Sequence, residues 1–222
     1  MNYESPLDIN KKPKSKAISF ILDVLINLAI VVALAVFIRL FIIEPFNVKG
    51  SSMCDTLNFV NGECKQESER ILVNKLSYLE VLGFKIGEPQ RGDIVVFQPP
   101  QGKSDSYIKR IIGLPGETLE LRNGEVYIFN QANPEGFMME ENYLNEKNNG
   151  KTFPLAGKKK FTIDEDSYFV MGDNRANSTD SRVCFRLDAS CHPGDKEFIT
   201  VKDINGKAWT TIWPLHKIRF IH

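Results

Sequence analysis

The chain is 222 residues long, and its 28 Lys and Arg side chains balance its 28 Asp and Glu side chains, so the formal net charge at pH 7 is zero. This length suffices for one sizeable domain together with a short additional segment. A neutral chain without a basic arm, zinc-finger spacing or internal repeat lacks the electrostatic footprint of a nucleic-acid-binding protein. We therefore expect no nucleic-acid partner.

One strongly apolar stretch covers residues 17–43, and its middle, residues 28–38, contains no polar side chain. A membrane-spanning helix needs about 20 largely apolar residues, so this stretch predicts a single transmembrane helix. Asp23 and Asn27 are four residues apart and share one face of such a helix. We interpret them as lying near the cytoplasmic interface; a polar face for a partner helix is the alternative.

Four lysines precede the apolar stretch: Lys11, Lys12, Lys14 and Lys16. Positive charge marks the cytoplasmic side of a membrane helix. We therefore expect residues 1–16 to form a cytoplasmic tail, residues 17–43 a signal anchor, and residues 44–222 an extracytoplasmic domain on the cell membrane. A cleaved signal peptide is the alternative, but no small-x-small cleavage site follows the stretch. An uncleaved, single-pass anchor is the favoured interpretation.

All four cysteines lie in the part expected outside the cytoplasm: Cys54, Cys64, Cys184 and Cys191. That compartment permits disulfides. Local pairing within each loop-like segment, 54 with 64 and 184 with 191, is the simplest hypothesis, and free buried thiols are the alternative. A metal site that includes His192 is a weaker hypothesis because the spacings match no common zinc pattern. We expect no metal and no other cofactor.

The sequence after the anchor predicts mainly β-structure. Residues 94–97 are a short apolar run suited to a buried strand. Residues 119–122 and 125–128 alternate apolar and charged side chains, and the Asn123-Gly124 pair between them is typical of a two-residue hairpin. Further strands are expected at residues 168–171, 208–213 and 218–221.

Two polar stretches are expected to be irregular. One is a variable excursion near residues 130–160, and the other is a loop at residues 183–196 that contains two of the cysteines. Long loops of this kind often carry function.

Ser52 is a candidate nucleophile, and a serine hydroxyl needs an adjacent base to act as one. Histidine, the usual base, is scarce, and the three present are His192, His216 and His222. A Ser-His-Asp arrangement is an alternative that spacing alone does not exclude, because triads are defined by geometry.

Lys109 is the candidate base. A lysine accepts a proton only when it is neutral, and burial lowers its pKa from about 10.4. Apolar neighbours flank Lys109 on both sides, and in a strand it shares a face with Tyr107 and Ile111. A solubilising pair of charges at a sheet edge is the alternative interpretation of Lys109 and Arg110.

Three sequence blocks follow the apolar stretch: GSSMCDTL at 50–57, YIKRIIGLPGE at 107–117 and GDNRANSTDSR at 172–182. Together with the anchor, GKAW at 206–209 and WP at 213–214, they resemble bacterial type I signal peptidases, the Ser/Lys proteases that remove signal peptides from exported proteins. The resemblance covers nearly the whole chain. It implies a mainly β fold, with an antiparallel β-sheet catalytic domain preceded by one N-terminal transmembrane helix.

The resemblance implies a role for each matching residue. The serine before methionine is the family's nucleophile and the lysine of the Lys-Arg pair its general base, which match Ser52 and Lys109. Supporting roles are implied for Ser178, which would orient the lysine by a hydrogen bond, for Asp180 and Arg182, which would stabilise that region, and for Asp173, which would pair with Arg110. An ordinary turn with surface ion pairs is the alternative.

The substrate is implied to bind as an extended strand between two edges of the enzyme, about residues 46–52 and 105–109, by β-augmentation. Shallow pockets there would admit small side chains at positions −1 and −3 of the cleavage site. The residues implied in substrate binding are Phe46, Val48, Gly50, Met53, Tyr107 and Ile108. The expected partners are preprotein signal peptides and the lipid bilayer, and we expect a monomer.

Three positions depart from the family pattern. The family usually has Pro at the position of Asp55 and often Asp at that of Ala176, and some members have a serine, a second oxyanion donor, at that of Gly50. An anchored but inactive relative that binds export substrates is therefore the alternative function. A self-cleaving Ser/Lys repressor is a weaker one, because it would need a DNA-binding domain. The retained nucleophile and base favour an active serine endopeptidase.

Overall fold

A computed structural model describes residues 16–60, 63–64, 69–81, 84–102 and 105–221. The chain divides into two compact units, Met1–Phe41 and Ile42–His222, and each is described by itself. Three of the four lysines behind the topology prediction, at positions 11, 12 and 14, lie outside the described residues.

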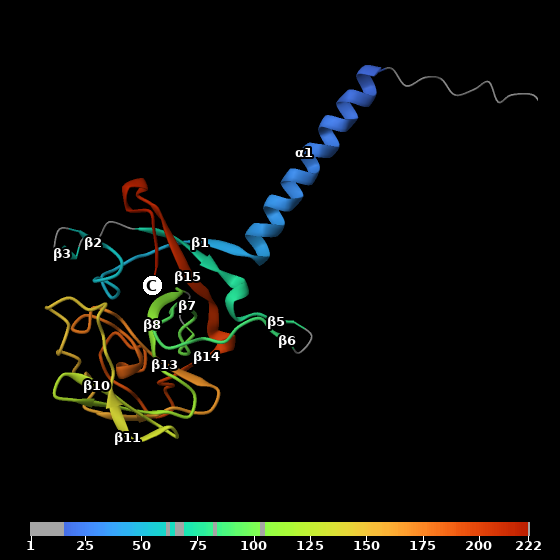
Figure 1. Cartoon of the computed structure of the whole chain (residues 1–222). Coiled ribbons are helices and arrows are strands. Elements are labelled where there is room, and N and C mark those ends of the chain that lie inside the picture. Colours follow the sequence, from blue (N-terminus) through green and yellow to red (C-terminus); the bar gives the residue numbers. More distant parts are fainter. Residues whose placement is uncertain (1–15, 61–62, 65–68, 82–83, 103–104, 222) are drawn as a thin grey trace, which may run out of the picture. The chain divides into compact units, whose positions relative to one another are not determined.

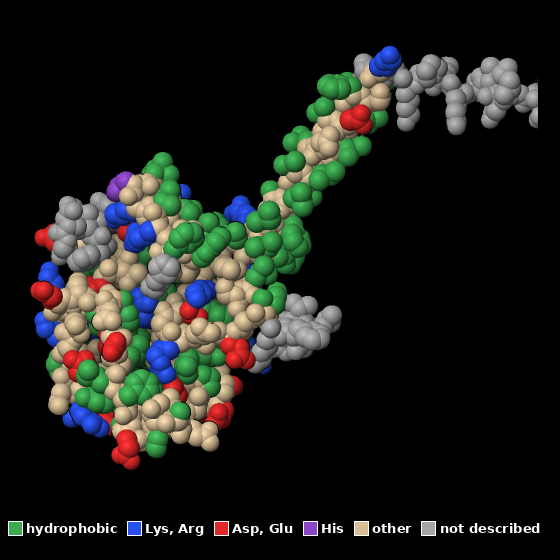
Figure 2. Space-filling model, in the orientation of Figure 1, with side chains coloured by type: hydrophobic (Ala, Val, Ile, Leu, Met, Phe, Trp, Pro, Cys, Tyr) green, Lys and Arg blue, Asp and Glu red, His purple; other side chains and the backbone are tan. Residues whose placement is uncertain are grey.

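The first unit contains the helix α1 (Lys16–Phe41). Its 26 residues give a length of about 39 Å at about 1.5 Å per residue, which exceeds the roughly 30 Å of a bilayer's hydrocarbon core. Residues 18–41 are the one segment of the described chain that is long and apolar enough to cross a membrane, and apolar side chains dominate its visible face (Figure 2). The helix ends before residue 43, ahead of Pro45, which disfavours helical backbone at the preceding residue.

The main sheet of the second unit has eight strands: β1 (Ile43–Asn47), β4 (Arg70–Asn74), β7 (Ile94–Phe97), β8 (Tyr107–Gly113), β13 (Ser167–Met171), β14 (Ile199–Thr200), β15 (Ile204–Trp213) and β16 (Arg219–Phe220). Their order is β1-β4-β15-β7-β8-β13-β14, with β16 paired to β15 (Figure 1). Every pairing is antiparallel. The prediction of a mainly β fold with one N-terminal helix is confirmed.

A second, four-stranded sheet has the order β11-β10-β9-β12. Its strands are β9 (Thr118–Arg122), β10 (Glu125–Asn130), β11 (Asn133–Met138) and β12 (Lys160–Thr162). The predicted hairpin joins β9 to β10: Asn123 and Gly124 have φ of +54° and +86°, the left-handed values that a type I′ turn requires. The expectation of an irregular excursion near residues 130–160 was wrong for β11, which pairs with β10.

The remaining elements are short. Two hairpins pair β2 (Phe59–Val60) with β3 (Glu63–Cys64) and β5 (Glu80–Val81) with β6 (Phe84–Lys85). Four 3-10 helices complete the described chain: η1 (Lys75–Tyr78), η2 (Ser181–Val183), η3 (Val201–Asp203) and η4 (Leu215–Lys217).

Apolar side chains from the strands form three buried clusters. All four residues of β7 are buried, as the apolar run predicts. The second cluster lies between β8, β13 and the second sheet, and the Phe161 and Phe169 rings contact each other there with centroids 4.7 Å apart. This packing fixes the second sheet against the strands that carry the candidate site.

We expect Phe169→Ala to lower the free energy of unfolding by about 3–5 kcal/mol, the usual cost of a large cavity in a core. Phe153→Ala, which removes a ring that is 54% exposed, should change it by less than about 0.5 kcal/mol. Denaturant unfolding of the full chain in detergent measures both. Equal effects of the two substitutions would contradict this description of the core.

Candidate active site

Ser52 and Lys109 lie next to each other although 57 residues separate them in the sequence. Ser52 belongs to a run of tight turns, residues 51–57, that follows β1, and Lys109 lies on β8. The Lys109 Nζ donates a hydrogen bond of 2.7 Å to Ser52 Oγ and another of 2.9 Å to the Ile108 carbonyl oxygen. The structure thus brings the predicted nucleophile and base into direct contact.

Lys109 is only 4% exposed. Loss of hydration is the largest effect on its amine, and it lowers the pKa of Lys109 to about 8. The carboxylates of Asp180 and Asp173 act in the opposite direction, and the Arg182 guanidinium acts in the same direction as burial. A buried lysine with this pKa is partly neutral near physiological pH.

Each of the two aspartates is paired with an arginine. Asp173 accepts hydrogen bonds of 2.9 and 2.8 Å from Nε and Nη2 of Arg110, and both side chains are almost fully buried. Arg110 also donates to the Gly92 carbonyl oxygen over 2.8 Å. The pairing expected between Asp173 and Arg110 is therefore present, and it connects β8 to the turn after β13.

Asp180 and Arg182 form a second buried pair, with distances of 2.9 Å from Nε to Oδ1 and 2.8 Å from Nη2 to Oδ2. Asp180 also accepts a hydrogen bond from the Gly172 amide over 3.1 Å. Burial by itself would raise the pKa of Asp180, but Arg182 and these hydrogen bonds hold it below its usual value. Asp180 is therefore a permanent anion close to Lys109.

Ser178 differs from the expectation. Its hydroxyl is buried and forms no hydrogen bond with any described residue, so the expected bond to Lys109 is not formed. The reason is that the lysine amine is directed to Ser52 and the Ile108 carbonyl oxygen instead. The hydroxyl lies near enough to Asp180 to help lower the pKa of that carboxyl, but the geometry falls short of a hydrogen bond.

Gly172 lies against the backbone of Ser52. A Cβ at this position would lie 2.3 Å from both the Ser52 carbonyl oxygen and Ser178 Oγ, so only glycine fits. The Ser52 carbonyl oxygen accepts a hydrogen bond of 3.0 Å from the Asn174 amide. The turn after β13 thus fixes the backbone at Ser52.

A groove of about 420 Å³ opens beside Ser52 and Lys109. One side consists of residues 46, 47 and 49–52, and the other of residues 105–109. The pairing of β8 with β13 begins only at Arg110, whereas its pairing with β7 extends back to Tyr107. The backbone of residues 107–109 is therefore a strand edge that faces the groove.

Four of the six predicted substrate-binding residues line this groove: Phe46, Gly50, Tyr107 and Ile108. The prediction was wrong for Val48 and Met53, which are 1% and 2% exposed and belong to a buried apolar cluster. Val48 lies between Asn47 and Lys49, which line the groove, but its own side chain belongs to the apolar cluster.

The cysteines form the two local pairs, Cys54–Cys64 and Cys184–Cys191. The first disulfide begins two residues after Ser52. The second closes a loop whose Leu187 lines the groove with an 81% exposed side chain.

Gly50 has a φ of +80°, which explains the departure from a serine at this position, because residues with a Cβ rarely adopt that conformation.

Several residues near the site were not predicted. Asn177 and Thr179 line the groove, and Asn177 donates a hydrogen bond of 2.8 Å to Ser51 Oγ. Asn58 donates to the carbonyl oxygens of Val48 and Gly50 over 3.4 and 3.2 Å. Asn177 lies inside a recognised sequence block, so its position could have suggested it, whereas no local pattern marks Asn58.

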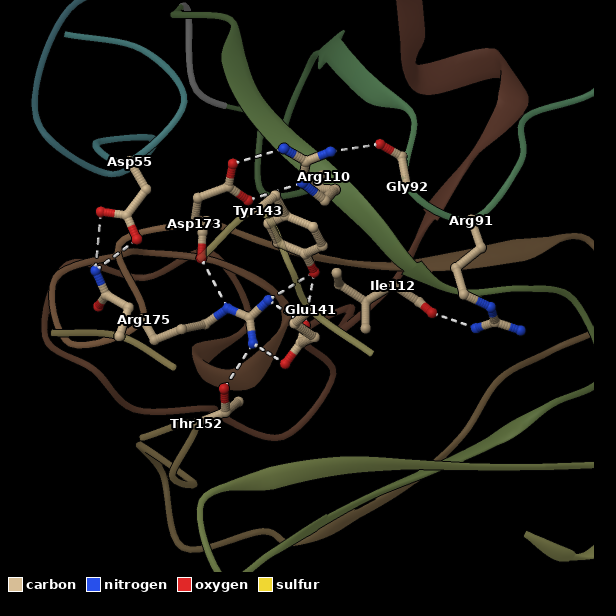
Figure 3. A network of polar contacts seen from close by, with 12 residues as sticks. Asp55, Arg91, Gly92, Arg110, Ile112, Glu141, Tyr143, Thr152, Asp173 and Arg175 are labelled. Atoms are coloured by element: carbon tan, nitrogen blue, oxygen red, sulfur yellow. Dashed lines mark hydrogen bonds and ion pairs between the residues drawn. The ribbon is translucent and has the colours of Figure 1, made fainter. Parts of the chain in front are cut away.

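A buried polar network extends from Arg110 (Figure 3). The Tyr143 ring lies 3.9 Å from the Arg110 guanidinium carbon and 5.9 Å from that of Arg175. Arg175 Nη1 donates to Glu141 over 2.8 Å and to Thr152 Oγ1 over 2.6 Å. Residues of the segment 141–152 thus contact both Arg110 and Arg175.

The chain matches known proteins over most of its length. A family profile described as "Signal peptidase, peptidase S26" matches residues 21–213. Signal peptidase I P of Bacillus subtilis subsp. natto is 35% identical over 216 residues, which covers 96% of this chain and 97% of that protein. Signal peptidase IB of Staphylococcus aureus (strain MRSA252) is 28% identical over 206 residues, with coverages of 90% and 93%.

Among solved structures, the crystal structure of a signal peptidase I from Enterococcus faecalis V583 is 31% identical to this chain. The match covers 55% of this chain and 98% of that one, with a TM-score of 0.40.

A β-rich catalytic unit with a serine beside a buried lysine, in a chain matched by peptidase relatives, defines a serine endopeptidase. The profile match over most of the chain and the relative at 35% identity also identify the family within this class. The chain belongs to the signal peptidase family, peptidase family S26. Its activity is the removal of signal peptides, and its apolar N-terminal helix fits a membrane-anchored enzyme.

We expect Gly172→Ala to lower kcat by about 100-fold, the scale of a displacement of about 1 Å at a reacting group, because the added methyl group would push on the Ser52 carbonyl oxygen. Gly113→Ala is the matched control: its Cβ would meet Ile163 and Phe169 instead, so it should lower stability and leave kcat near the wild-type value. Steady-state cleavage and thermal unfolding measure both effects. Loss of kcat in both variants alike would contradict the expectation.

Proposed function

We propose that Ser52 is the nucleophile and Lys109 the general base of this signal peptidase. The observation that carries the proposal is the 2.7 Å hydrogen bond between the Lys109 amine and the Ser52 hydroxyl, in a site where burial lowers the pKa of Lys109 to about 8. A neutral amine at this distance accepts a proton from the hydroxyl as the hydroxyl attacks. No feature of the site favours the inactive alternative.

Cleavage proceeds through an acyl-enzyme. Ser52 Oγ attacks the scissile carbonyl carbon while Lys109 takes its proton, and the protonated lysine then gives a proton to the leaving amine. A water molecule, activated by the same amine, hydrolyses the ester. The Ser52 backbone N–H stabilises the oxyanion. The left-handed Gly50 offers no side-chain donor, so the second oxyanion donor found in some members is missing at this position.

The preprotein binds as an extended strand in the groove, with its backbone paired to the edge formed by residues 107–109. Cleavage follows small-x-small sequences. Support comes from the groove's position beside Ser52 and from the residues of β1 and β8 that line it.

The enzyme spans the cell membrane once through α1, with its N-terminus in the cytoplasm and the domain of residues 44–222 outside. Lysines before the helix support this orientation, and two disulfides suit an extracytoplasmic domain. Contact with lipid is supported by exposed apolar side chains between β15 and β16, within these strands and the η4 region that joins them: Trp209, Trp213, Leu215, Ile218 and Phe220. Ser52 and Lys109 lie in one chain, so the dyad needs no second copy, and we propose that the enzyme acts as a monomer.

Ser52→Ala and Lys109→Ala should each lower kcat by at least about 10⁴-fold, the scale seen when a peptidase loses its nucleophile or base. The measurement is cleavage of a preprotein with an Ala-x-Ala site by the full chain in detergent. Lys159→Ala, which removes an exposed lysine, is the control. Cleavage that survives Lys109→Ala in a folded enzyme would show that another group is the base.

The pH dependence of kcat/KM should follow the protonation of Lys109. Below its pKa of about 8, the amine is increasingly protonated and cannot accept the Ser52 proton, so kcat/KM should fall about tenfold for each pH unit. Asp180 has a lowered pKa and stays ionised over this range, so its titration does not change kcat/KM there. A rate that does not change between about pH 6 and pH 9 would exclude a lysine base of this pKa.

A further inference from the structure

Asp55 lies three residues after Ser52, within the turns formed by residues 51–57. Backbone hydrogen bonds inside this segment join the amide of residue 54 to the carbonyl of residue 51 over 3.0 Å, and the amides of residues 56 and 57 to the carbonyl of residue 53 over 3.1 and 2.8 Å. A shift at any of these residues moves Ser52, because the segment is one continuous series of turns.

The Asp55 carboxylate contacts a distant part of the chain. It accepts hydrogen bonds from Asn145, over 3.0 Å from the amide and 2.6 Å from Nδ2. It also accepts from Asn148 Nδ2, over 3.2 Å to Oδ1 and 3.0 Å to Oδ2. Both carboxylate oxygens are therefore occupied by donors that lie about 90 residues further along the sequence.

The partner segment, residues 141–152, is itself firmly held. Glu141 and Thr152, at its two ends, both bind the buried Arg175 guanidinium. The amides of Asn148 and Asn149 donate to the Asn145 carbonyl oxygen over 3.0 and 2.8 Å. A segment fixed at both ends and bonded internally offers a rigid attachment for the Asp55 carboxylate.

The same segment also reaches the strand that carries Lys109. Tyr143 packs on the guanidinium of Arg110, the residue after Lys109. Figure 3 draws Asp55 and Arg110 in the same group of polar contacts, with Tyr143 beside Arg110. Segment 141–152 therefore contacts both the turn that carries the nucleophile and the strand that carries the base.

We propose that Asp55 is a positioning residue for Ser52: its carboxylate fixes the turn of residues 51–57 to segment 141–152, and so sets the direction from which Ser52 Oγ meets Lys109 Nζ. The proposal rests on the proposed function of the Ser52–Lys109 pair. Asp55 does not line the groove, so it acts on the chemical step and not on substrate binding.

The first test compares Asp55→Ala and Asn148→Ala in the full chain in detergent, with an Ala-x-Ala preprotein as substrate. Each should lower kcat by about 10- to 100-fold, the scale of a misplaced reacting group, with KM unchanged. The double variant should be no slower than the slower single variant, because Asp55→Ala already removes the contact that Asn148→Ala breaks. Asp164→Ala, which removes an exposed carboxylate, should retain wild-type kcat.

The second test restores the contact with its donor and acceptor exchanged. Asp55→Asn combined with Asn148→Asp lets the amide at position 55 donate to a carboxylate at position 148, so this pair should recover most of the kcat lost by Asp55→Asn alone. A merely structural role would predict recovery of the melting temperature only. The exchange also keeps the proposal testable if Asp55→Ala does not fold.

Wild-type kcat in a folded Asp55→Ala enzyme would overturn the proposal, as would additive losses in the double variant or no recovery in the exchanged pair. Ser52→Ala is measured alongside. If Ser52→Ala still cleaves, the proposed function fails whatever Asp55 does. If Ser52→Ala is inactive while Asp55→Ala is fully active, only the positioning role fails.

Discussion

The removal of the Lys109 amine from water is the constraint on which the rest of the site depends. An ammonium group in water has no tendency to lose its proton near neutral pH, and burial supplies that tendency. Burial also requires hydrogen-bond partners for the amine, because an unpaired buried polar group is costly. Ser52 Oγ and the Ile108 carbonyl oxygen are those partners, so the need to satisfy the lysine also aligns it with the serine.

Two carboxylates near Lys109 would defeat this effect if they were free, since a nearby negative charge stabilises the ammonium form. Each is instead bonded on both oxygens to its own arginine: Asp173 to Arg110, and Asp180 to Arg182. Arg182 acts against the field of these aspartates at the amine. These pairs therefore shape the site as much through charge balance as through the hydrogen bonds that connect its strands.

The sequence alone predicted those parts of the fold and of the site that depend on local patterns or on motifs. The hairpin at Asn123-Gly124 and the buried strand at residues 94–97 follow from turn chemistry and from apolar runs, and both are present. The contact between Ser52 and Lys109 was expected from a motif and not from physics, because 57 residues separate them.

The failures have equally physical causes. Val48 was assigned to the groove because the sequence does not show that its side chain joins the apolar cluster while those of Asn47 and Lys49 line the groove. The contacts of Asp55 join residues about 90 positions apart, and no local pattern encodes them.

The strand edge at residues 107–109 has a consequence for the range of proteins that one such enzyme can process. A strand edge binds backbone amides and carbonyls, which every polypeptide carries. The binding free energy from these hydrogen bonds therefore depends little on the side chains of the substrate. Selection is then left to size exclusion at a few positions and to whether a segment is extended and within reach. A groove of this kind suits an enzyme that must process many exported chains of unrelated sequence; proline, which lacks an amide proton, is the one residue whose backbone could not donate to the edge.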